Sequence, residues 1–265
     1  MSSKFLWITD IHLDFLSTPE VDRFIGKLRS ESPDALLIGG DISVAPKLSA
    51  FLKKIDGALD SKIYFVLGNH DFYHGSIMGV RREIRDLTEK SDKLIFLDDS
   101  QPVKITKDTT LVGHGCWADG RNGDYGSSDV MLNDYVLIDE LKDLSKSQRL
   151  AKLHELGDEA ADRLRHNLNL AFENNKNVLC LTHVPPFREA CQYQGHVAND
   201  DFLPHFSCKA VGDVMLEVMH KRADSNLTVL SGHTHNPSRA QILGNLVVIT
   251  GGAEYGKPAV QDWTW

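Results

Sequence analysis

Five short motifs of metal-binding residue types stand in order along the chain, and each follows a short apolar run. They are Asp10-Ile11-His12, Gly40-Asp41, Gly68-Asn69-His70-Asp71, Thr182-His183 and Gly232-His233-Thr234-His235. A short apolar run that ends in polar residues is typical of a buried strand followed by a loop. Residues at such strand ends can be held rigidly while they face a solvent-filled cleft. The five motifs together therefore predict an α/β protein with one two-metal site.

Apolar runs and helical periodicities alternate in the first two-thirds of the chain, most regularly up to residue 90. Residues 21, 24, 25 and 28, for example, place apolar side chains on one helical face, with Pro19 in the first turn. This rhythm predicts a parallel sheet with right-handed crossovers. The expected strands are residues 5–9, 35–38 and 63–67, and the expected helices are residues 19–30, 46–56 and 76–90.

The later part of the chain changes its pattern. Closely spaced apolar runs with hairpin-like separations occur at residues 94–97, 103–106 and 110–113, and again at 227–230, 239–243 and 246–249, where Gly244-Asn245 signals a tight turn. A long amphipathic helix is expected at residues 147–174. Both halves fit a four-layer αββα sandwich of two mixed β-sheets flanked by helices. We expect one domain, residues 1–265, with insertions at about residues 116–175 and 187–209.

Charge and cysteine usage narrow the functional classes. The formal net charge is −8, which argues against a surface for non-specific nucleic-acid binding, because such surfaces are usually basic. Phosphate substrates stay compatible with this charge, because bound divalent metals invert the local sign. The four cysteines are irregularly spaced and are interpreted as free thiols. No signal-peptide pattern and no apolar run of the ~20 residues that span a bilayer is present, so we expect a cytoplasmic protein without a membrane segment.

The motif residues are the ligand types that divalent first-row metals prefer. A carboxylate such as Asp41 can bridge two cations, and the full set suits two metals about 3.5–4 Å apart. A hydroxide held between such metals forms near neutral pH and is placed to attack a phosphorus atom. His70 follows a candidate ligand without being needed as one, so it is the candidate general acid. The candidate ligands are Asp10, His12, Asp41, Asn69, His183, His233 and His235. The metals could be Mn, Fe, Zn or Ni.

The five motifs resemble those of the calcineurin-like metallophosphoesterases, which read D-x-H, G-D, G-N-H-[DE], H and G-H-x-H. The resemblance spans residues 8–235 and implies the αββα sandwich. It also implies that His70 contacts substrate and acts as an acid. By the same resemblance, the first metal would be held by Asp10, His12, Asp41 and His235, and the second by Asp41, Asn69, His183 and His233.

The second motif departs from one branch of that family. Protein Ser/Thr phosphatases continue it as G-D-x-x-D-R-G, whereas residues 40–46 here lack both the Asp and the Arg. The chain is therefore not expected to belong to that branch, and the partner that orients His70 is not identified. If an arginine binds the substrate phosphate, it must come from a part of the chain outside this motif. The candidates are Arg121 and Arg188, with His196 as a further substrate contact.

Several neighbouring side chains are interpreted as structural. Asp71 is expected to support the site rather than bind metal, and His114 is expected to play a structural or supporting role. Trp117 and Tyr125 are expected to anchor their insertion to the core. His205 is expected on the exposed surface of its loop.

Three functions compete. The first is a metal-dependent phosphoesterase acting on a small or medium phosphorylated molecule, with monoesters and diesters not separated. The second is a nuclease, against which the acidic balance counts, because neither insertion contains a run of Lys or Arg. The third is a non-catalytic metal-binding scaffold, in which ligands or the catalytic histidine are usually lost. A homodimer is a fair default expectation.

Overall fold

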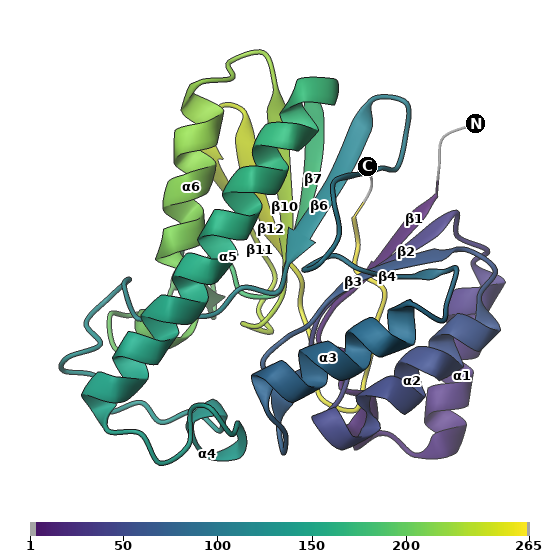
Figure 1. Ribbon diagram of the computed structural model, residues 1–265, viewed down its shortest axis with the longest axis horizontal. Coiled ribbons are helices and arrows are strands. Elements are labelled where there is room, and N and C mark those ends of the chain that lie inside the picture. Colours follow the sequence, from purple (N-terminus) through teal and green to yellow (C-terminus); the bar gives the residue numbers. More distant parts are fainter. Residues whose placement is uncertain (1–3, 264–265) are drawn as a thin grey trace.

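The computed structural model describes residues 4–263 and contains two β-sheets packed face to face with helices outside (Figure 1). The four-stranded sheet has the order β1 (Phe5–Ile8), β2 (Ala35–Gly39), β3 (Lys62–Val66) and β4 (Leu94–Phe96). The six-stranded sheet has the order β11 (Ser238–Leu243), β12 (Leu246–Thr250), β10 (Asn226–Ser231), β7 (Asn177–Thr182), β6 (Thr109–His114) and β5 (Val103–Lys104). The expected two-sheet α/β architecture is confirmed.

The helices lie on the outer faces of the two sheets (Figure 1). Helices α1 (Thr18–Ser30), α2 (Ala45–Ala58) and α3 (Ile77–Thr88) cover the four-stranded sheet, and α5 (Lys146–Asn174) and α6 (Lys209–His220) cover the six-stranded sheet. Each helix is amphipathic and buries its apolar stripe. In α1 the buried side chains are Val21, Phe24, Ile25 and Leu28.

The period-two alternation of the strands divides the core into separate layers. In β1, Leu6 and Ile8 pack against α1–α3, whereas Trp7 points the other way into the space between the sheets. Leu37 of β2 joins Trp7 there and meets Leu230 of β10. Because both faces of these strands are covered, their sequences are almost wholly apolar.

Two details differ from the expectation for the sheets. The six-stranded sheet is the mixed one, with antiparallel pairs β5–β6 and β11–β12 at its edges, whereas every pairing in the four-stranded sheet is parallel. In addition, β4 does not form a hairpin with β5, because it pairs with β3 after the α3 crossover. Of the three runs between residues 94 and 113, the last two form a hairpin, and β11 and β12 form the other expected hairpin across Gly244-Asn245. The apolar runs were recognised, but spacing alone did not show that the chain changes sheets after β4.

The two segments interpreted above as insertions, at about residues 116–175 and 187–209, contain short elements of their own; the names first and second insertion are kept for them. The first holds α4 (Asp134–Leu137) and continues into α5, and Trp117 and Tyr125 are buried in the main core as expected. The second holds a two-stranded ribbon of β8 (Gln192–Tyr193) and β9 (His196–Val197). Within residues 4–263, no helix is long and apolar enough to cross a membrane.

Candidate metal centre

All five motifs follow the carboxyl end of a parallel strand, namely β1, β2, β3, β7 and β10. The two sheets direct these ends toward one another, so residues far apart in sequence become neighbours. The amide of Asp10 donates to the carbonyl of Gly40 at 3.0 Å, and the amide of Gly232 donates to the carbonyl of His183 at 2.9 Å. The loops that carry the candidate ligands therefore hold one another in place.

The backbone of several candidate ligands lies in the left-handed region, which residues other than glycine rarely adopt. The φ angles are 51° at Asp10, 39° at His12, 49° at Asp41, 69° at His233 and 56° at His235. An extended strand through these positions would place Asp10 and His12 on one face, but β1 ends at Ile8. A turn of strained backbone brings both side chains into the site instead. Such strain is found where the surrounding structure imposes a functional geometry.

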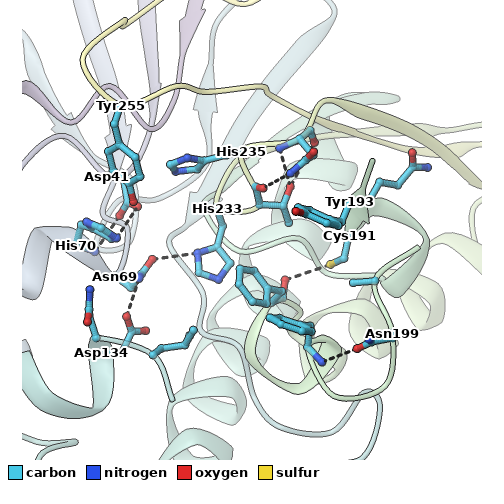
Figure 2. A pocket seen from close by; sticks show the side chains of 18 of the residues that line it. Asp41, Asn69, His70, Asp134, Cys191, Tyr193, Asn199, His233, His235 and Tyr255 are labelled. Carbon is cyan, nitrogen blue, oxygen red and sulfur yellow. Dashed lines mark hydrogen bonds and ion pairs between the residues drawn. The ribbon is translucent and has the colours of Figure 1, made fainter. Parts of the chain in front are cut away.

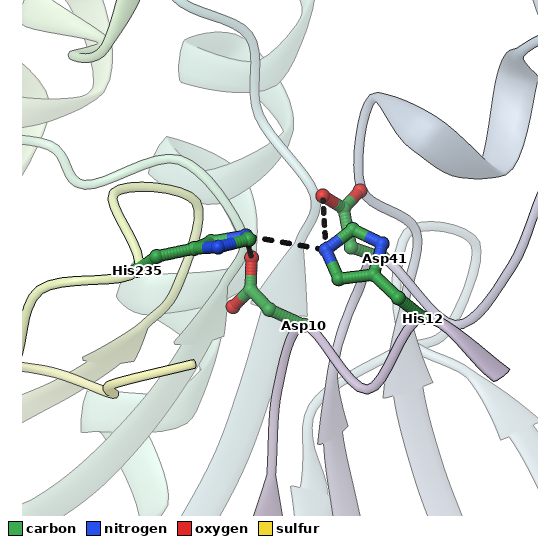
Figure 3. Close-up of side chains that lie close together, drawn as sticks. All are labelled: Asp10, His12, Asp41 and His235. Atoms are coloured by element: carbon green, nitrogen blue, oxygen red, sulfur yellow. Dashed lines mark hydrogen bonds and ion pairs between the residues drawn. The ribbon is translucent and has the colours of Figure 1, made fainter. Parts of the chain in front are cut away.

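The first group of candidate ligands converges tightly (Figure 3). One donor atom from each of Asp10, His12, Asp41 and His235 lies within 4.8 Å of all the others. His12 Nε2 is 3.2 Å from His235 Nε2 and 3.7 Å from Asp41 Oδ2. His235 Nε2 is 3.4 Å from Asp10 Oδ1. Two imidazole nitrogens that face each other beside two carboxylates fit a divalent cation between them.

The second group meets at the amide oxygen of Asn69. Asn69 Oδ1 is 3.0 Å from His183 Nε2 and 3.0 Å from His233 Nδ1. Asp41 joins the groups, since its Oδ1 lies 3.4 Å from His183 Nε2 while its Oδ2 faces His12. The structure therefore brings all seven candidate ligands together and directs the two oxygens of Asp41 toward different groups.

Backbone carbonyls set which ring nitrogen of each second-group histidine is free. The Nδ1 of His183 donates to the carbonyl of Gly39 at 2.9 Å, and the Nε2 of His233 donates to the carbonyl of His205 at 3.1 Å. These bonds assign the tautomers: His183 Nδ1 and His233 Nε2 carry the protons, and the unprotonated His183 Nε2 and His233 Nδ1 direct their lone pairs toward Asn69. Both lone pairs are thus available to a cation.

Burial keeps the imidazoles in the neutral form that metals bind. Desolvation lowers the pKa of His12 to about 2 and that of His233 to about 3. Burial, together with the nearby carboxylates of Asp10 and Asp71, holds the pKa of Asp41 well above its usual range. A buried carboxylate without positive charge beside it is stabilised by a cation. The donor set and its electrostatics thus fit divalent metal ions.

Two further residues support Asn69, and the sequence reasoning did not identify them. Asp134 Oδ1 accepts a hydrogen bond from Asn69 Nδ2 at 2.8 Å and another from the hydroxyl of Tyr73 at 2.6 Å. Asp134 is buried and belongs to α4 in the first insertion, 65 positions from Asn69. It belongs to none of the motifs, so only the Asp residue type could have drawn attention to it.

His70 lies beside Asp41 and His12 and is partly exposed to the cleft. Its ring stacks on Tyr73, with centroids 4.2 Å apart and planes inclined by 28°. Its Nε2 lies 4.0 Å from Asp41 Oδ2, and its ring lies 4.6 Å from that of His12. The ring of Tyr73 therefore takes part in orienting His70, a role for which the sequence offered no candidate.

Asp71 ties two of the ligand loops together, in line with its expected supporting role. Its Oδ1 accepts the amides of Ile42 and Ser43 at 2.9 Å each, and its Oδ2 accepts the amide of Gly68 at 2.8 Å. His114 is also buried, and its Nδ1 accepts the amide of Cys116 at 2.9 Å. Both side chains build the loops that surround the site.

A cleft of about 690 Å³ opens beside the candidate ligands (Figure 2). None of the predicted substrate residues Arg121, Arg188 and His196 is among the described residues that line it. Arg121 pairs with Asp119 at 3.0 Å and with an oxygen of Asp158 at 2.9 Å, and Arg188 pairs with Asp200 at 3.3 Å. His196 is exposed in β9. Carboxylates thus hold both arginines away from the cleft, and His196 belongs to the β8–β9 ribbon. A substrate role for the three residues stays a prediction.

The expectation for His205 was wrong, because its side chain is buried rather than exposed. Its Nδ1 lies 2.5 Å from the hydroxyl of Tyr135, and its Nε2 lies 3.1 Å from Ser128 Oγ. His205 thus joins the two insertions, and its carbonyl orients His233. The four cysteines are free, as expected, and all of them are buried.

Comparisons with known proteins show the family and the fold of this chain. The family model described as calcineurin-like phosphoesterase matches residues 3–237. An uncharacterized metallophosphoesterase of Campylobacter jejuni is 34% identical over 98 residues, which cover 36% of this chain and only 25% of that protein. Among solved structures, the phosphopantetheinyl hydrolase PptH of Mycobacterium tuberculosis superposes with a TM-score of 0.67 at 15% identity, covering 94% of this chain and 89% of the other. A dimetal phosphatase of Danio rerio superposes with a TM-score of 0.58 at 16% identity, covering 94% and 87%. The two structures show that the fold is shared.

Proposed function

This chain belongs to the calcineurin-like phosphoesterases, and we propose that it hydrolyses phosphate esters of small or medium-sized organic molecules with the help of two divalent metal ions. The observation that carries this proposal is the position of Asp41. Its Oδ1 faces His183 at 3.4 Å and its Oδ2 faces His12 at 3.7 Å, so one carboxylate joins two sets of ligands. When bound there, such ions would supply an activated water and neutralise charge on the phosphoryl group.

The residues of the chain divide the remaining work. His70 would donate a proton to the leaving oxygen. Burial, followed by the charge of His183, lowers the pKa of His70 to about 4, so the free imidazole is neutral at pH 7 and donates poorly. A bound phosphate group would raise this pKa through its negative charge. His70 would thus become an effective acid only beside its substrate.

The lining of the cleft favours a small substrate over a nucleic acid. None of the described lining residues is a Lys or an Arg, and the net charge is −8, whereas surfaces that track a nucleic-acid backbone are basic. Two proteins with this fold are named a phosphopantetheinyl hydrolase and a dimetal phosphatase, and both names are compatible with the proposal. We place the activity in the cytoplasm, which the four free cysteines support. The homodimer stays a prediction.

The proposal is tested with metal-stripped protein to which Mn²⁺, Ni²⁺ or Zn²⁺ is restored. Release of p-nitrophenol is followed from p-nitrophenyl phosphate and from bis-p-nitrophenyl phosphate, and the ratio of the two rates separates monoesterase from diesterase. We expect turnover that depends on added metal and is lost in Asp41→Asn, with His166→Ala on the exposed face of α5 as the control. Two bound ions per chain without any turnover would instead favour the non-catalytic scaffold.

A further inference from the structure

The cleft is much larger than a phosphate group needs. Its volume of about 690 Å³ lies in the range of sites that hold whole small molecules. It extends from the candidate ligands to the second insertion, which contributes Gln192, Tyr193, Asn199 and Phe202 to its lining. Tyr193 and Asn199 lie across the cleft from His70 and Asn69 (Figure 2). This part lies beyond the groups that would handle the phosphate, so it faces the rest of the substrate.

Three aromatic side chains of the second insertion line the cleft, and we call Tyr193, Phe202 and Phe206 the aromatic wall. The ring centroid of Phe206 lies 5.0 Å from that of His233, and the ring centroid of Phe202 lies 6.2 Å from that of Phe206. Tyr193 and Phe202 leave 62% and 46% of their surfaces exposed. Exposed aromatic side chains that flank a cleft are typical of ligand contacts. A group attached to a phosphate at the metal centre would reach this wall directly.

The polar side chains in the same region are uncharged. Amide groups of Asn133, Gln192, Asn199 and Asn236 lie among the lining residues, and the cleft has no Lys or Arg among its described lining residues. The one acidic lining residue outside the candidate ligands, Asp134, is hydrogen-bonded to Asn69 and Tyr73. The region can therefore hydrogen-bond a neutral ligand, but it holds no cation to neutralise a second phosphate.

We propose that the wall formed by Tyr193, Phe202 and Phe206 binds a flat, uncharged group with amide-like edges on the alcohol part of the substrate. This inference rests on the proposed function and names its substrate class: an ester with a single phosphate whose alcohol carries a nucleobase-like group. Aromatic side chains bind such groups by stacking, and the amides reach their hydrogen-bonding edges. A second phosphate on the same molecule weakens binding, because its charge loses hydration without gaining a partner.

Three matched ligands test the proposal by calorimetry with the full-length, Mn²⁺-loaded His70→Ala protein, in which hydrolysis of an alkyl phosphate is slowed so that binding heats are measured. They are 2-deoxyribose 5-phosphate, thymidine 5′-monophosphate and thymidine 3′,5′-bisphosphate. The first two differ in the base alone, and the last two differ in one phosphate alone. We expect the monophosphate to bind at least ~10-fold more tightly than the sugar phosphate and more tightly than the bisphosphate.

Substitutions in the aromatic wall test whether it is the source of the nucleotide's higher affinity. Phe202→Ala, and Tyr193→Ala combined with it, should remove most of the advantage of the nucleotide while leaving the affinity for the sugar phosphate unchanged. Phe202→Leu keeps apolar bulk without the aromatic face and should lose part of the advantage. Met78→Ala removes an exposed apolar side chain that does not line the cleft and should leave all three affinities unchanged.

Equal affinities for the sugar phosphate and the nucleotide would overturn the proposal, as would tightest binding of the bisphosphate. An advantage that survives in the double variant would also overturn it, because the wall would then not be its source. Release of p-nitrophenol by the protein with His70 intact tests the phosphoesterase activity separately. Turnover without a preference for the nucleotide would therefore refute only the proposed role of the aromatic wall. Nucleotide binding without turnover would refute only the proposed phosphoesterase activity.

Discussion

Asp134 anchors Asn69 by accepting a hydrogen bond from its Nδ2 at 2.8 Å. The bond fixes which end of the amide points inward, so Asn69 Oδ1 faces His183 and His233. A residue of the first insertion thus sets the geometry of a candidate ligand on the loop after β3. This segment therefore helps to build the candidate metal centre.

Asp134→Ala should weaken the second metal site selectively. Loss of a residue that orients a metal ligand typically costs about 10–100-fold in metal affinity, and the group around Asp10 and His235 does not contact Asp134. Calorimetric titration of the metal-free protein with Mn²⁺ would show one site weakened and one retained. Asp129→Ala removes an exposed carboxylate from the same insertion and serves as the control. Equal weakening of both sites would contradict a specific role for Asp134.

His70→Ala should slow hydrolysis according to the leaving group. General acid catalysis contributes about 10²–10⁴-fold when the leaving oxygen needs a proton. Phenyl esters need that proton, whereas p-nitrophenolate leaves readily without it. We therefore expect kcat for phenyl phosphate to fall by at least ~100-fold and kcat for p-nitrophenyl phosphate to fall much less. A uniform loss for both esters would show that His70 positions the substrate rather than protonating the leaving group.

Metal binding should release a proton from Asp41. The pKa of this carboxyl is raised well above its usual range, first by burial and then by the charge of Asp10. The carboxyl therefore stays protonated at pH values above the ordinary ~3.9 of an aspartate, and the cation must displace that proton. Metal affinity should then rise with pH and level off above the raised pKa. Titrations in two buffers of different ionisation enthalpy measure the release, and identical heats in both would contradict it.

Gly68→Ala should disrupt the centre, because a methyl group at this position has no room. An added Cβ would overlap Asp41 Oδ1 and lie 2.7 Å from His183 Cε1. Overpacking of this kind costs about 1–3 kcal/mol, and it also displaces the shared carboxylate. Gly26→Ala is the matched control, since an added Cβ there meets no atom within 4 Å and helix propensity favours alanine by about 1 kcal/mol. We expect Gly68→Ala, but not Gly26→Ala, to lower the free energy of unfolding in urea and the affinity for Mn²⁺. Equal values for the two variants would refute the steric argument.

Arg121→Ala should affect stability rather than substrate binding. The guanidinium pairs with Asp119 and Asp158, and Asp119 also accepts the amides of Lys209 and Ala210 at the start of α6. We expect the free energy of unfolding to fall by about 1 kcal/mol, a small value because Arg121 is partly exposed, with KM for p-nitrophenyl phosphate unchanged. A KM raised tenfold or more at unchanged stability would restore Arg121 as a substrate contact.

The sequence by itself determined the chemistry and most of the secondary structure. Residue type decides which side chains can bind a metal, and the five motifs contain all seven candidate ligands. Hydrophobic periodicity identified the long helix α5 within one residue of its observed start and at its observed end, because an amphipathic stripe of that length has few other ways to be buried. Local sequence patterns were therefore enough to predict those features that depend only on neighbouring residues in the chain.

Tertiary structure alone decided the relationships between distant segments. Asp134 belongs to none of the motifs, yet the fold places it against Asn69. His205 reads as a loop histidine, but packing against Tyr135 buries it. The change of sheet after β4 and the left-handed backbone at Asp10 and His12 likewise depend on which strands pair. Burial, pairing and strain are properties of atoms brought together by folding, and no residue carries them alone.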